Sequence, residues 1–469
     1  MKNSKHDIGC RLAKFLVIIL ATIPFAACWY LFFADNIPMP YFNRGNLVMI
    51  AIFVTLYVSF ARIYDAFWIS INKASELAYS QILSVLIADG IMYIIIWLVN
   101  HYVPNILPCL VTLAVQAVLV TLWSFCVQKW YFRSFPPVKT AVIYNRRSDV
   151  PALFEKYGMN KKFDVQLILN PKTCVEDLSQ LDSFQTVFIC DVQSHDRNVI
   201  LKYCIANDIG VYVLPRIGDI IMSGAHKMHM FHLPMLQVTR RNLRPEHAFF
   251  KRLIDIVFSA VGLLILSPVM LVTAIAIKVT DGGPVFYKQV RLTKNGKLFN
   301  VLKFRSMRVD AEKDGKARLS TGEKDDRITP VGRVIRKVRI DELPQLLNIL
   351  SGSMSLVGPR PERPEIAELY EQVLPEFRLR LQAKAGLTGY AQVYGKYNTT
   401  PYDKLQMDLM YIATSSFLED LRIILATIKI LFTPESTDGV EEGQMTAIEV
   451  RSEADWKRED REPVASAKR

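Results

Sequence analysis

Cysteine patterns typical of metal sites and disulfide scaffolds are missing from this sequence. The 469 residues include seven cysteines, no two of which stand at the spacing of metal ligands. Three of the seven lie in apolar stretches. Neither a zinc site nor a disulfide-stabilised fold is therefore expected.

A glycine-rich turn is also missing where a dinucleotide-binding fold would place one. After residue 137, short β-rich runs alternate with helical stretches, which predicts a parallel, Rossmann-like α/β domain of roughly 100 residues. The predicted strands are 140–144, 165–169, 186–190 and 210–214. The first runs into Asn145-Arg146-Arg147, with no glycine to let the backbone approach a pyrophosphate. Binding of NAD in the usual way is not expected, and neither is a nucleotide-sugar dehydratase or epimerase, the rival function that needs this turn.

Charged residues are nearly absent from four long stretches. Each stretch is close to the ~20 residues that a bilayer-spanning helix needs. The stretches are residues 16–33, 47–61, 82–99 and 107–127. We predict four membrane spans, of which the second is short and the third contains Asp89.

The placement of lysine and arginine around these stretches sets their orientation. The N-terminal leader has four such residues, the first loop has only Arg44, and the third loop has none. By the positive-inside rule, both ends of the four-span region face the cytoplasm. A cleaved signal peptide is the competing interpretation of the first stretch, but the apolar run is too long and no small-x-small cleavage site follows it.

The formal net charge of +12 raises the question of a nucleic-acid partner. Much of the excess flanks the apolar stretches and surrounds a pair of carboxylates in the second half of the chain. Anionic lipid and phosphorylated substrates account for the charge better, so no nucleic-acid partner is expected.

A fifth apolar stretch, residues 253–277, differs from the first four. It is interrupted by Ser267-Pro268 and is basic at both ends, with Lys251-Arg252 before it and Lys278 after it. Proline within a helix removes a backbone hydrogen bond and bends the chain, and the serine hydroxyl can satisfy the freed carbonyl. Basic residues at both ends indicate that both ends lie on one side of the membrane. We predict a re-entrant helix, with a kinked but complete fifth span as the alternative.

Three histidines, His226, His229 and His232, recur at every third residue. This spacing scatters side chains over both faces of a strand and drifts around a helix. Acidic residues that would support a metal site are not close by. An exposed strand or an interdomain segment is therefore expected instead of a metal site.

The chemical centre of the sequence is the adjacent pair Asp341-Glu342, which stands among basic residues. These basic residues are Arg336, Lys337, Arg339 and Arg360. Carboxylates among cations can hold a metal ion and the phosphates of a nucleotide sugar. Asp341 also has the pattern of a helix N-cap, with Pro344 in the first turn. The two interpretations are compatible, because a helix N-terminus can present groups to phosphate.

Several ordered motifs between residues 249 and 433 point to one family. They are Lys251-Arg252-Leu253-Ile254-Asp255, Ser267-Pro268, Lys303-Phe304-Arg305-Ser306-Met307, Asp341-Glu342-Leu343-Pro344-Gln345, Ser355-Leu356-Val357-Gly358-Pro359-Arg360-Pro361 and Gly386-Leu387-Thr388-Gly389. This region resembles the bacterial sugar transferases, monotopic phosphoglycosyl transferases that move a sugar 1-phosphate from a nucleotide diphosphate sugar to polyprenyl phosphate. With the preceding spans and the α/β domain, the whole chain resembles the large polyprenyl-phosphate hexose-1-phosphate transferases.

The resemblance implies a role for each central residue. Asp341 is expected to attack the sugar-bearing phosphorus of a UDP-hexose and expel UMP, and undecaprenyl phosphate then attacks the phosphosugar-aspartyl intermediate. Glu342 is expected to bind the cofactor Mg²⁺. The expected phosphate-binding residues are Arg336 and Arg360, with Lys303 and Arg305 as weaker candidates. Asp255 is either functional or a structural partner of a nearby arginine.

One stretch departs from the family pattern. Where the family tends to have Tyr-Ile-Glu-Asn-Trp-Ser, this chain has Tyr411-Ile412-Ala413-Thr414-Ser415-Ser416, and so loses polar and aromatic groups that could recognise the donor. Asp408 and Tyr411 survive. Residues 421–432 have the pattern of an amphipathic helix on a membrane surface.

The sequence predicts four parts in one bacterial inner-membrane protein with cytoplasmic soluble domains. They are a four-helix transmembrane region (1–134), a degenerate Rossmann-like α/β domain (138–247), a mainly α-helical monotopic catalytic domain (248–433, with the re-entrant helix at 253–277) and a charged, disordered tail (434–469). The expected function is to start exopolysaccharide, capsule or O-antigen assembly, with membrane lipid and a second copy of the chain as candidate partners. The alternative is a catalytically idle membrane scaffold of a polysaccharide assembly complex. The sequence does not identify the hexose.

Overall fold

The computed structural model describes residues 2–38, 43–145, 150–240, 245–309, 311, 327–395 and 400–431. The chain divides into two compact units, Met1–Leu214 and Pro215–Arg469. Predictions that concern Arg146, Arg147 and the tail 434–469 lie outside the described residues.

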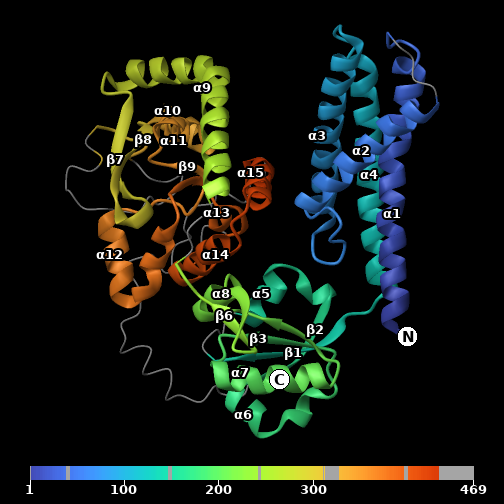
Figure 1. Cartoon of the computed structure of the whole chain (residues 1–469), viewed down its shortest axis with the longest axis vertical. Coiled ribbons are helices and arrows are strands. Elements are labelled where there is room, and N and C mark those ends of the chain that lie inside the picture. The colour runs from blue at the N-terminus through green and yellow to red at the C-terminus, as the bar shows by residue number, and fades with distance from the viewer. Residues whose placement is uncertain are drawn as a thin grey trace. The chain divides into compact units, whose positions relative to one another are not determined.

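Four long helices form the first part of the first unit (Figure 1). They are α1 (Lys2–Cys28), which continues into the π-helical turn η1 (Trp29–Phe33), α2 (Asn43–Ile63), α3 (Ala74–Asn100) and α4 (Leu107–Ser134). Both α2 and α4 pack against α1 and α3. By length and composition, each of the four is able to cross a membrane, which agrees with the four predicted spans.

The interior of this bundle combines apolar packing with a few hydrogen bonds between helices. Phe25 of α1 stacks on Phe53 of α2, with ring centroids 4.3 Å apart. The amide nitrogen of Gln116 in α4 donates to the carbonyl of Ala21 in α1 over 2.8 Å. Hydrogen bonds of this kind link helices in an apolar medium, where water is not available as a competing partner.

A four-stranded parallel sheet completes the first unit. Its elements, in chain order, are β1 (Val138–Tyr144), α5 (Val150–Lys156), η2 (Met159–Lys161), β2 (Phe163–Leu169), α6 (Pro171–Glu176), η3 (Leu178–Leu181), β3 (Thr186–Cys190), α7 (Ser194–Ala206) and β4 (Gly210–Val213). The strand order is β2-β1-β3-β4, and every neighbouring pair is parallel. The predicted parallel α/β sheet is thus confirmed, because buried β-branched strands alternate with helices that cover them.

We expect no tight NAD binding by this sheet. The strand order changes direction beside β1, where open parallel sheets usually bind ligands, yet β1 ends without the glycines that let a pyrophosphate approach the backbone. Thermal unfolding of the full chain in detergent, measured without NAD and with NAD from micromolar to millimolar concentration, checks this expectation. An unchanged midpoint agrees with it, whereas stabilisation by micromolar NAD contradicts it.

The second unit begins with a helix and a hairpin. These are α8 (Ile217–Ser223) and the antiparallel strands β5 (His226–Met230) and β6 (Leu233–Gln237). Ile220 of α8 is buried in the same core as Leu405 and Leu409, and Gln406 donates to the carbonyl of Pro215 over 2.6 Å. Residues from 215 onward, which the sequence assigns to the middle domain, therefore pack with the second unit.

The histidines at every third residue lie on this hairpin. His226 and His229 are exposed on β5, as the prediction of an exposed strand requires, and His232 lies in the turn with a positive φ of 61°. Among the residues that the structure describes, no group of three or more His, Cys, Asp or Glu side chains is placed to hold a metal ion.

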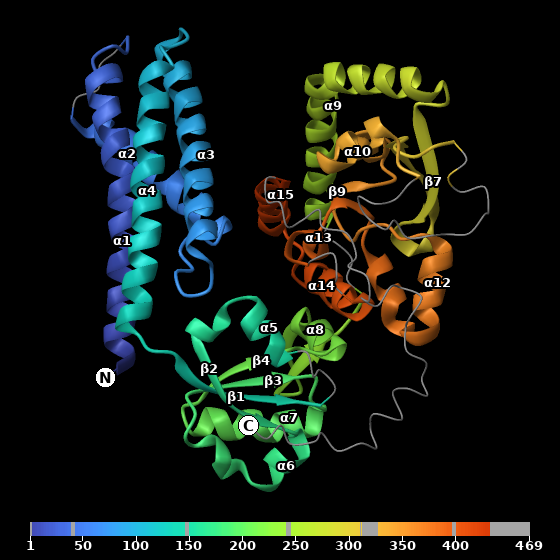
Figure 2. The ribbon, with the colours of Figure 1, turned by 180° about the vertical axis from the view of Figure 1, so that it is seen from behind.

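The long helix α9 (Pro245–Asp281) contains the fifth apolar stretch and bends sharply, so that Figures 1 and 2 show it as two arms. Pro268 lies inside the helix and cannot donate to the carbonyl of Leu264. The hydroxyl of Ser267 donates to that carbonyl instead, over 2.8 Å. The predicted compensation of the proline break by the serine is confirmed. By length and composition α9 is a fifth helix able to cross a membrane.

Short elements follow α9 and build the rest of the unit. They are the antiparallel strands β7 (Phe286–Leu292) and β8 (Leu298–Phe304) with η4 (Lys294–Gly296) between them, α10 (Pro330–Lys337), η6 (Ile340–Glu342), α11 (Gln345–Ser351), β9 (Ser355–Val357), α12 (Pro364–Val373), η7 (Pro375–Gln382), β10 (Gly386–Thr388), α13 (Tyr390–Tyr394), α14 (Pro401–Thr414) and α15 (Phe417–Leu431). Strand β9 pairs in parallel with β10. Helix α11 packs against both α9 and β8, which brings the motifs on these elements together.

Candidate active site

The Asp341-Glu342 pair lies in a tight connection between two helices. Helix α10 is capped by Thr329, whose hydroxyl accepts from the N–H of Gly332 over 2.9 Å, and it ends at Lys337. Arg339 then takes the left-handed conformation at φ 55°, which costs a non-glycine residue roughly 1–2 kcal/mol. This turn directs the chain into the 3₁₀ segment η6, where Asp341 is buried. The expectation that Asp341 caps a helix is wrong, because the next helix begins only at Gln345 after Pro344.

Glu342 is enclosed by three cations. Its Oε1 lies 2.8 Å from Nη2 of Arg360 and 3.3 Å from Nζ of Lys303, and its Oε2 lies 4.0 Å from Nη1 of Arg339. Burial by itself would raise the pKa of Glu342, but Arg360 and Lys303 outweigh it and hold that pKa well below its usual value. The lowered pKa favours the ionised form of Glu342, whose charge holds the three cations close to it.

The pKa of Asp341 is shifted in the opposite direction from that of Glu342. Its side chain is only 9% exposed, and burial raises its pKa above the usual value, while Lys303 partly offsets the effect. Glu342 beside it raises the pKa further, and Arg336 and Arg360 lower it. A carboxylate that is poorly solvated and next to cations is suited to attack phosphorus, because little water must be removed from it.

Three of the four predicted phosphate-binding residues act on this pair. Lys303 and Arg360 contact Glu342, and Arg336 acts on Asp341 through its charge. In the described part of the chain, Nη1 of Arg336 is buried without a hydrogen-bond partner. Arg305 is placed differently. It is buried, and its guanidinium packs so closely on Gly283 that a Cβ there would collide with it.

A second set of charged residues, which the sequence did not assign to the site, lies next to the chain segment that carries Arg360. Arg380 of η7 forms an ion pair with Asp408 of α14 over 2.7 Å. Burial raises the pKa of Asp408 to about 6, against the opposing effect of Arg380. Glu362 lies between Arg380 at 3.8 Å and Arg291 at 3.7 Å. Asp408 is the one member that the sequence singled out, as a residue of the family pattern, and its pairing was not predictable because the members come from separate elements.

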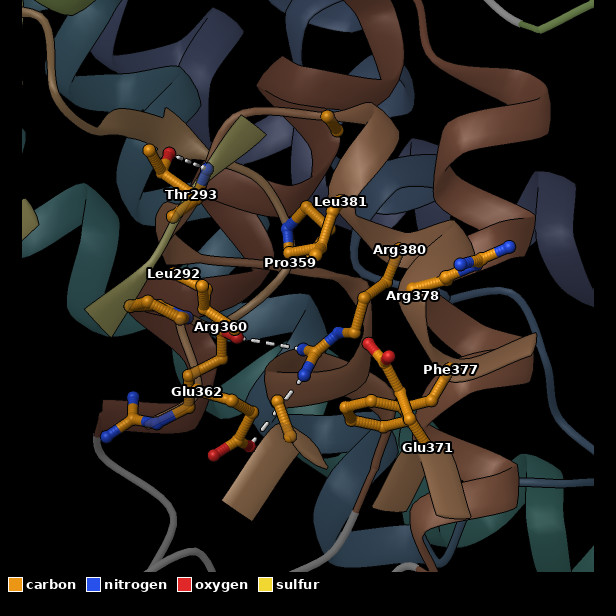
Figure 3. Close-up of a pocket in the computed structure, with 14 residues that line it drawn as sticks. Leu292, Thr293, Pro359, Arg360, Glu362, Glu371, Phe377, Arg378, Arg380 and Leu381 are labelled. Carbon is orange, nitrogen blue, oxygen red and sulfur yellow. Dashed lines mark hydrogen bonds and ion pairs between the residues drawn. The ribbon is translucent and has the colours of Figure 1, made fainter. Parts of the chain in front are cut away.

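A pocket lies between these charges and the chain segment that carries Arg360 (Figure 3). Its lining residues are Leu292, Thr293, Pro359, Arg360, Pro361, Glu362, Ala367, Glu371, Phe377, Arg378, Arg380, Leu381, Ala383 and Ala385. Arg360 thus belongs both to the surroundings of Glu342 and to the wall of this pocket.

The first family motif ties the base of α9 to the rest of the unit. Nζ of Lys251 lies 2.8 Å from Asp420 of α15 and donates to the carbonyl of Val357 over 3.0 Å. Asp255 accepts from the hydroxyl of Ser355 over 3.1 Å and from the N–H of Leu356 over 2.8 Å. The structural alternative for Asp255 is therefore supported, although its partners are a serine and a backbone amide and not an arginine.

The stretch that departs from the family pattern is used for packing. Tyr411 is buried, and its hydroxyl donates to Asp420 over 2.7 Å. Ala413 lies directly against Gly224 at the end of α8, where even a Cβ on Gly224 would approach it to 3.0 Å. This close contact joins α14 to the end of α8.

Comparison with known proteins agrees with this geometry. The family model described as bacterial sugar transferase matches residues 246–434. A UDP-N-acetylgalactosamine-undecaprenyl-phosphate N-acetylgalactosaminephosphotransferase of Aeromonas hydrophila is 36% identical over 290 residues, which are 59% of this chain and 67% of that protein. A UDP-glucose:undecaprenyl-phosphate glucose-1-phosphate transferase of Caulobacter vibrioides is 40% identical over 191 residues, 40% of this chain and 71% of that protein.

A third relative matches over nearly its whole length. The exopolysaccharide production protein PSS of Rhizobium leguminosarum bv. phaseoli is 41% identical over 187 residues, which are 38% of this chain and 92% of that protein. Identity and coverage of this size, together with the ordered motifs, show that the chain belongs to the bacterial sugar transferase family.

Proposed function

We propose that the chain transfers a hexose 1-phosphate from a UDP-hexose to undecaprenyl phosphate and releases UMP. The observation that carries this proposal is the buried Asp341 beside Glu342 and its enclosing cations. A diphosphate is highly anionic, and a group of fixed cations beside a carboxylate can both bind it and present it for attack. Two relatives are named for such a transfer to undecaprenyl phosphate, one with N-acetylgalactosamine and one with glucose. These names do not assign the sugar that this chain transfers.

The chemistry consists of two displacements at one phosphorus. In the first, a carboxylate oxygen of Asp341 bonds to the sugar-bearing phosphorus, the bond from this phosphorus to the bridging oxygen breaks, and UMP leaves. In the second, a phosphate oxygen of undecaprenyl phosphate bonds to the same phosphorus and the acyl phosphate bond to Asp341 breaks. The products are undecaprenyl diphosphate hexose and free enzyme. An acyl phosphate is reactive enough to pass its group on in this way.

The cations around the pair support both steps. Arg360 and Arg336 are placed to hold phosphate oxygens while charge redistributes, and Lys303 completes the positive side of the site. Fixed side chains do this with little reorganisation, because Glu342 already holds Arg360 and Lys303 in position.

The donor set also fits Mg²⁺, which we propose as the cofactor. Mg²⁺ usually takes one or two carboxylates from the protein and completes its shell with substrate phosphates and water. Glu342, the carboxylate among these cations, would hold it. When bound, the ion would neutralise charge on the diphosphate.

The proposal is tested by incubating purified full-length protein with radiolabelled UDP-glucose, UDP-galactose or UDP-N-acetylgalactosamine, Mg²⁺ and undecaprenyl phosphate. We expect label in the lipid extract and an equal amount of UMP with at least one donor. No product with any UDP-sugar would favour the idle scaffold instead. If product forms, we propose that this reaction is the first step of exopolysaccharide, capsule or O-antigen assembly, in line with the relative named for exopolysaccharide production.

We further propose that α9 enters the inner membrane and returns on the same side, so that the parallel sheet of the first unit and the catalytic residues of the second unit are both on the cytoplasmic side. The bend of α9, the basic residues at its two ends and the exposed apolar side chains along it support this topology, for example Leu264 at 77% and Val272 at 68% exposed. It also keeps Asp341 on the side where nucleotide sugars are made.

Cysteine labelling in intact cells tests this topology. We expect Thr173→Cys on α6 and Glu368→Cys on α12, both at exposed positions, to resist a membrane-impermeant thiol reagent added outside. Val103→Cys, which is 66% exposed between α3 and α4 in a loop predicted to face outward, is the matched control that should react above the wild-type background. Labelling at 368 with protection at 173 would mean that α9 crosses the membrane completely.

A further inference from the structure

Residues 359–362 carry Arg360 to the carboxylate pair, and all four of their carbonyls accept hydrogen bonds from other parts of the chain. The first carbonyl accepts from the N–H of Gly386 over 2.9 Å, and the last accepts from the N–H of Leu292 over 3.0 Å. Two of the four residues are prolines, which have no N–H to donate. The position of this segment therefore depends on hydrogen-bond donors from other parts of the chain.

The two middle carbonyls are held by arginine side chains. Nη2 of Arg380 donates to the carbonyl of Arg360 over 2.8 Å, and Nη1 of Arg291 donates to the carbonyl of Pro361 over 3.0 Å. Figure 3 shows Arg380 directed toward this segment and Arg378, two residues earlier, directed away from it. A guanidinium can hold a carbonyl and a carboxylate at the same time because its donors are spread over a rigid plane.

Both arginines are themselves fixed. Arg380 is only 5% exposed and is paired with Asp408 at 2.7 Å, and Glu362 lies within 3.8 Å of each arginine. Arg291 is further held by Gln289, whose Oε1 accepts from Nη2 over 2.6 Å. The donor to the Arg360 carbonyl is thus part of a buried, charge-balanced group that spans η7, α14 and β7.

The side chain of Arg360 is less constrained than its backbone. It is 42% exposed, and its contact with Glu342 is made by a single nitrogen, Nη2, at 2.8 Å. The position of its guanidinium is therefore set by two constraints, the single contact with Glu342 at one end and the backbone position at the other.

We propose that Arg380, held by Asp408, is a positioning residue for the transfer reaction. By fixing the carbonyl of Arg360, it sets where the Arg360 guanidinium stands beside Glu342 and the incoming diphosphate. This inference rests on the proposed function. It adds a residue that touches neither substrate nor the carboxylate pair and acts only through Arg360.

A double-mutant cycle on kcat/KM tests the proposal with full-length protein, UDP-sugar, Mg²⁺ and undecaprenyl phosphate. Arg380→Lys keeps a positive charge next to Asp408 but loses the planar fork, and we expect it to lower kcat/KM about 10- to 100-fold, as small misplacements of binding groups do. In the Arg360→Ala background the same change should lower kcat/KM less than about threefold, because the group it positions is gone. Arg133→Lys, at an exposed position in the last turn of α4, is the matched control and should stay within about twofold of wild type.

An equal loss in both backgrounds would overturn the proposal, since Arg380 would then act independently of Arg360. Thermal unfolding in detergent monitors the fold of each variant. A second double-mutant cycle replaces Arg380→Lys by Asp408→Asn, which keeps the shape of the side chain that pairs with Arg380. If neither Arg380→Lys nor Asp408→Asn shows an unfolding transition, Arg380 has a purely structural role, and this result also overturns the proposal. Failure of the proposed function is distinct, because wild-type protein would then release no UMP.

Discussion

We expect Asp341→Asn to abolish transfer and to leave the protein folded. The amide keeps the size and planarity of the buried side chain in η6, but it is a far weaker nucleophile than a carboxylate. Removal of a covalent nucleophile typically lowers turnover roughly 10³-fold or more. The measurement is lipid-extractable label together with UMP release, in the assay that tests the proposed function.

The control for this variant is Asp208→Asn, at an exposed position of the first unit, where asparagine also tolerates the positive φ of 56°. It should retain wild-type turnover. A direct signature accompanies the loss: without undecaprenyl phosphate, wild-type protein should retain hydroxylamine-sensitive label from a sugar-labelled donor, and Asp341→Asn should retain none. Wild-type turnover by Asp341→Asn would rule out the nucleophile assignment.

Sequence reasoning located the parts of the site that depend on short stretches of chain. Asp341, Glu342, Lys303 and Arg360 stand in motifs of a few residues, and Lys303 and Arg360 both form ion pairs with Glu342. The bend in α9 was also predictable, because a proline and the preceding serine determine it locally through the carbonyl of Leu264. Parallel strands were predictable for the same reason, since the apolar runs and the helical stretches between them are continuous in sequence.

Local pattern was misleading where the backbone conformation overrides it. Asp341 follows helix α10 and precedes an apolar run, which is typical of an N-cap, but the left-handed Arg339 and the 3₁₀ turn delay the next helix to Gln345. Arg305 stands two residues after Lys303, yet it is buried against Gly283. Spacing along the sequence does not reveal that the fold gives two cations only two residues apart such different surroundings.

Contacts between distant residues could not be predicted at all. Arg380 is 20 residues from the carbonyl of Arg360 that it holds, and Arg291 is 70 residues from that of Pro361. Arginines and carboxylates at such separations are common on protein surfaces, where ion pairs contribute little, so their sequence gives no signal. Only the fold shows that Arg380 and Asp408 are buried, that they pair, and that Arg380 contacts the carbonyl of Arg360.

We expect Glu342→Gln to lower activity in a different way from Asp341→Asn. Glutamine keeps the shape of the side chain but removes the charge that gathers Arg360, Lys303 and Arg339. The cations then repel one another without compensation, and the protein loses the carboxylate proposed to bind Mg²⁺. We expect turnover to fall about 10²-fold or more at a fixed Mg²⁺ concentration.

A Mg²⁺ titration separates this effect from loss of the nucleophile. In Glu342→Gln the Mg²⁺ concentration for half-maximal turnover should rise at least about tenfold, so that part of the lost activity returns at high Mg²⁺. Glu365→Gln, at an exposed position in the first turn of α12, is the matched control and should titrate like wild type. Because Asp341 is unchanged in Glu342→Gln, the covalent intermediate should still form, only more slowly. A wild-type Mg²⁺ dependence in Glu342→Gln would remove Glu342 from the metal site and leave it the role of holding Arg360 and Lys303 in place.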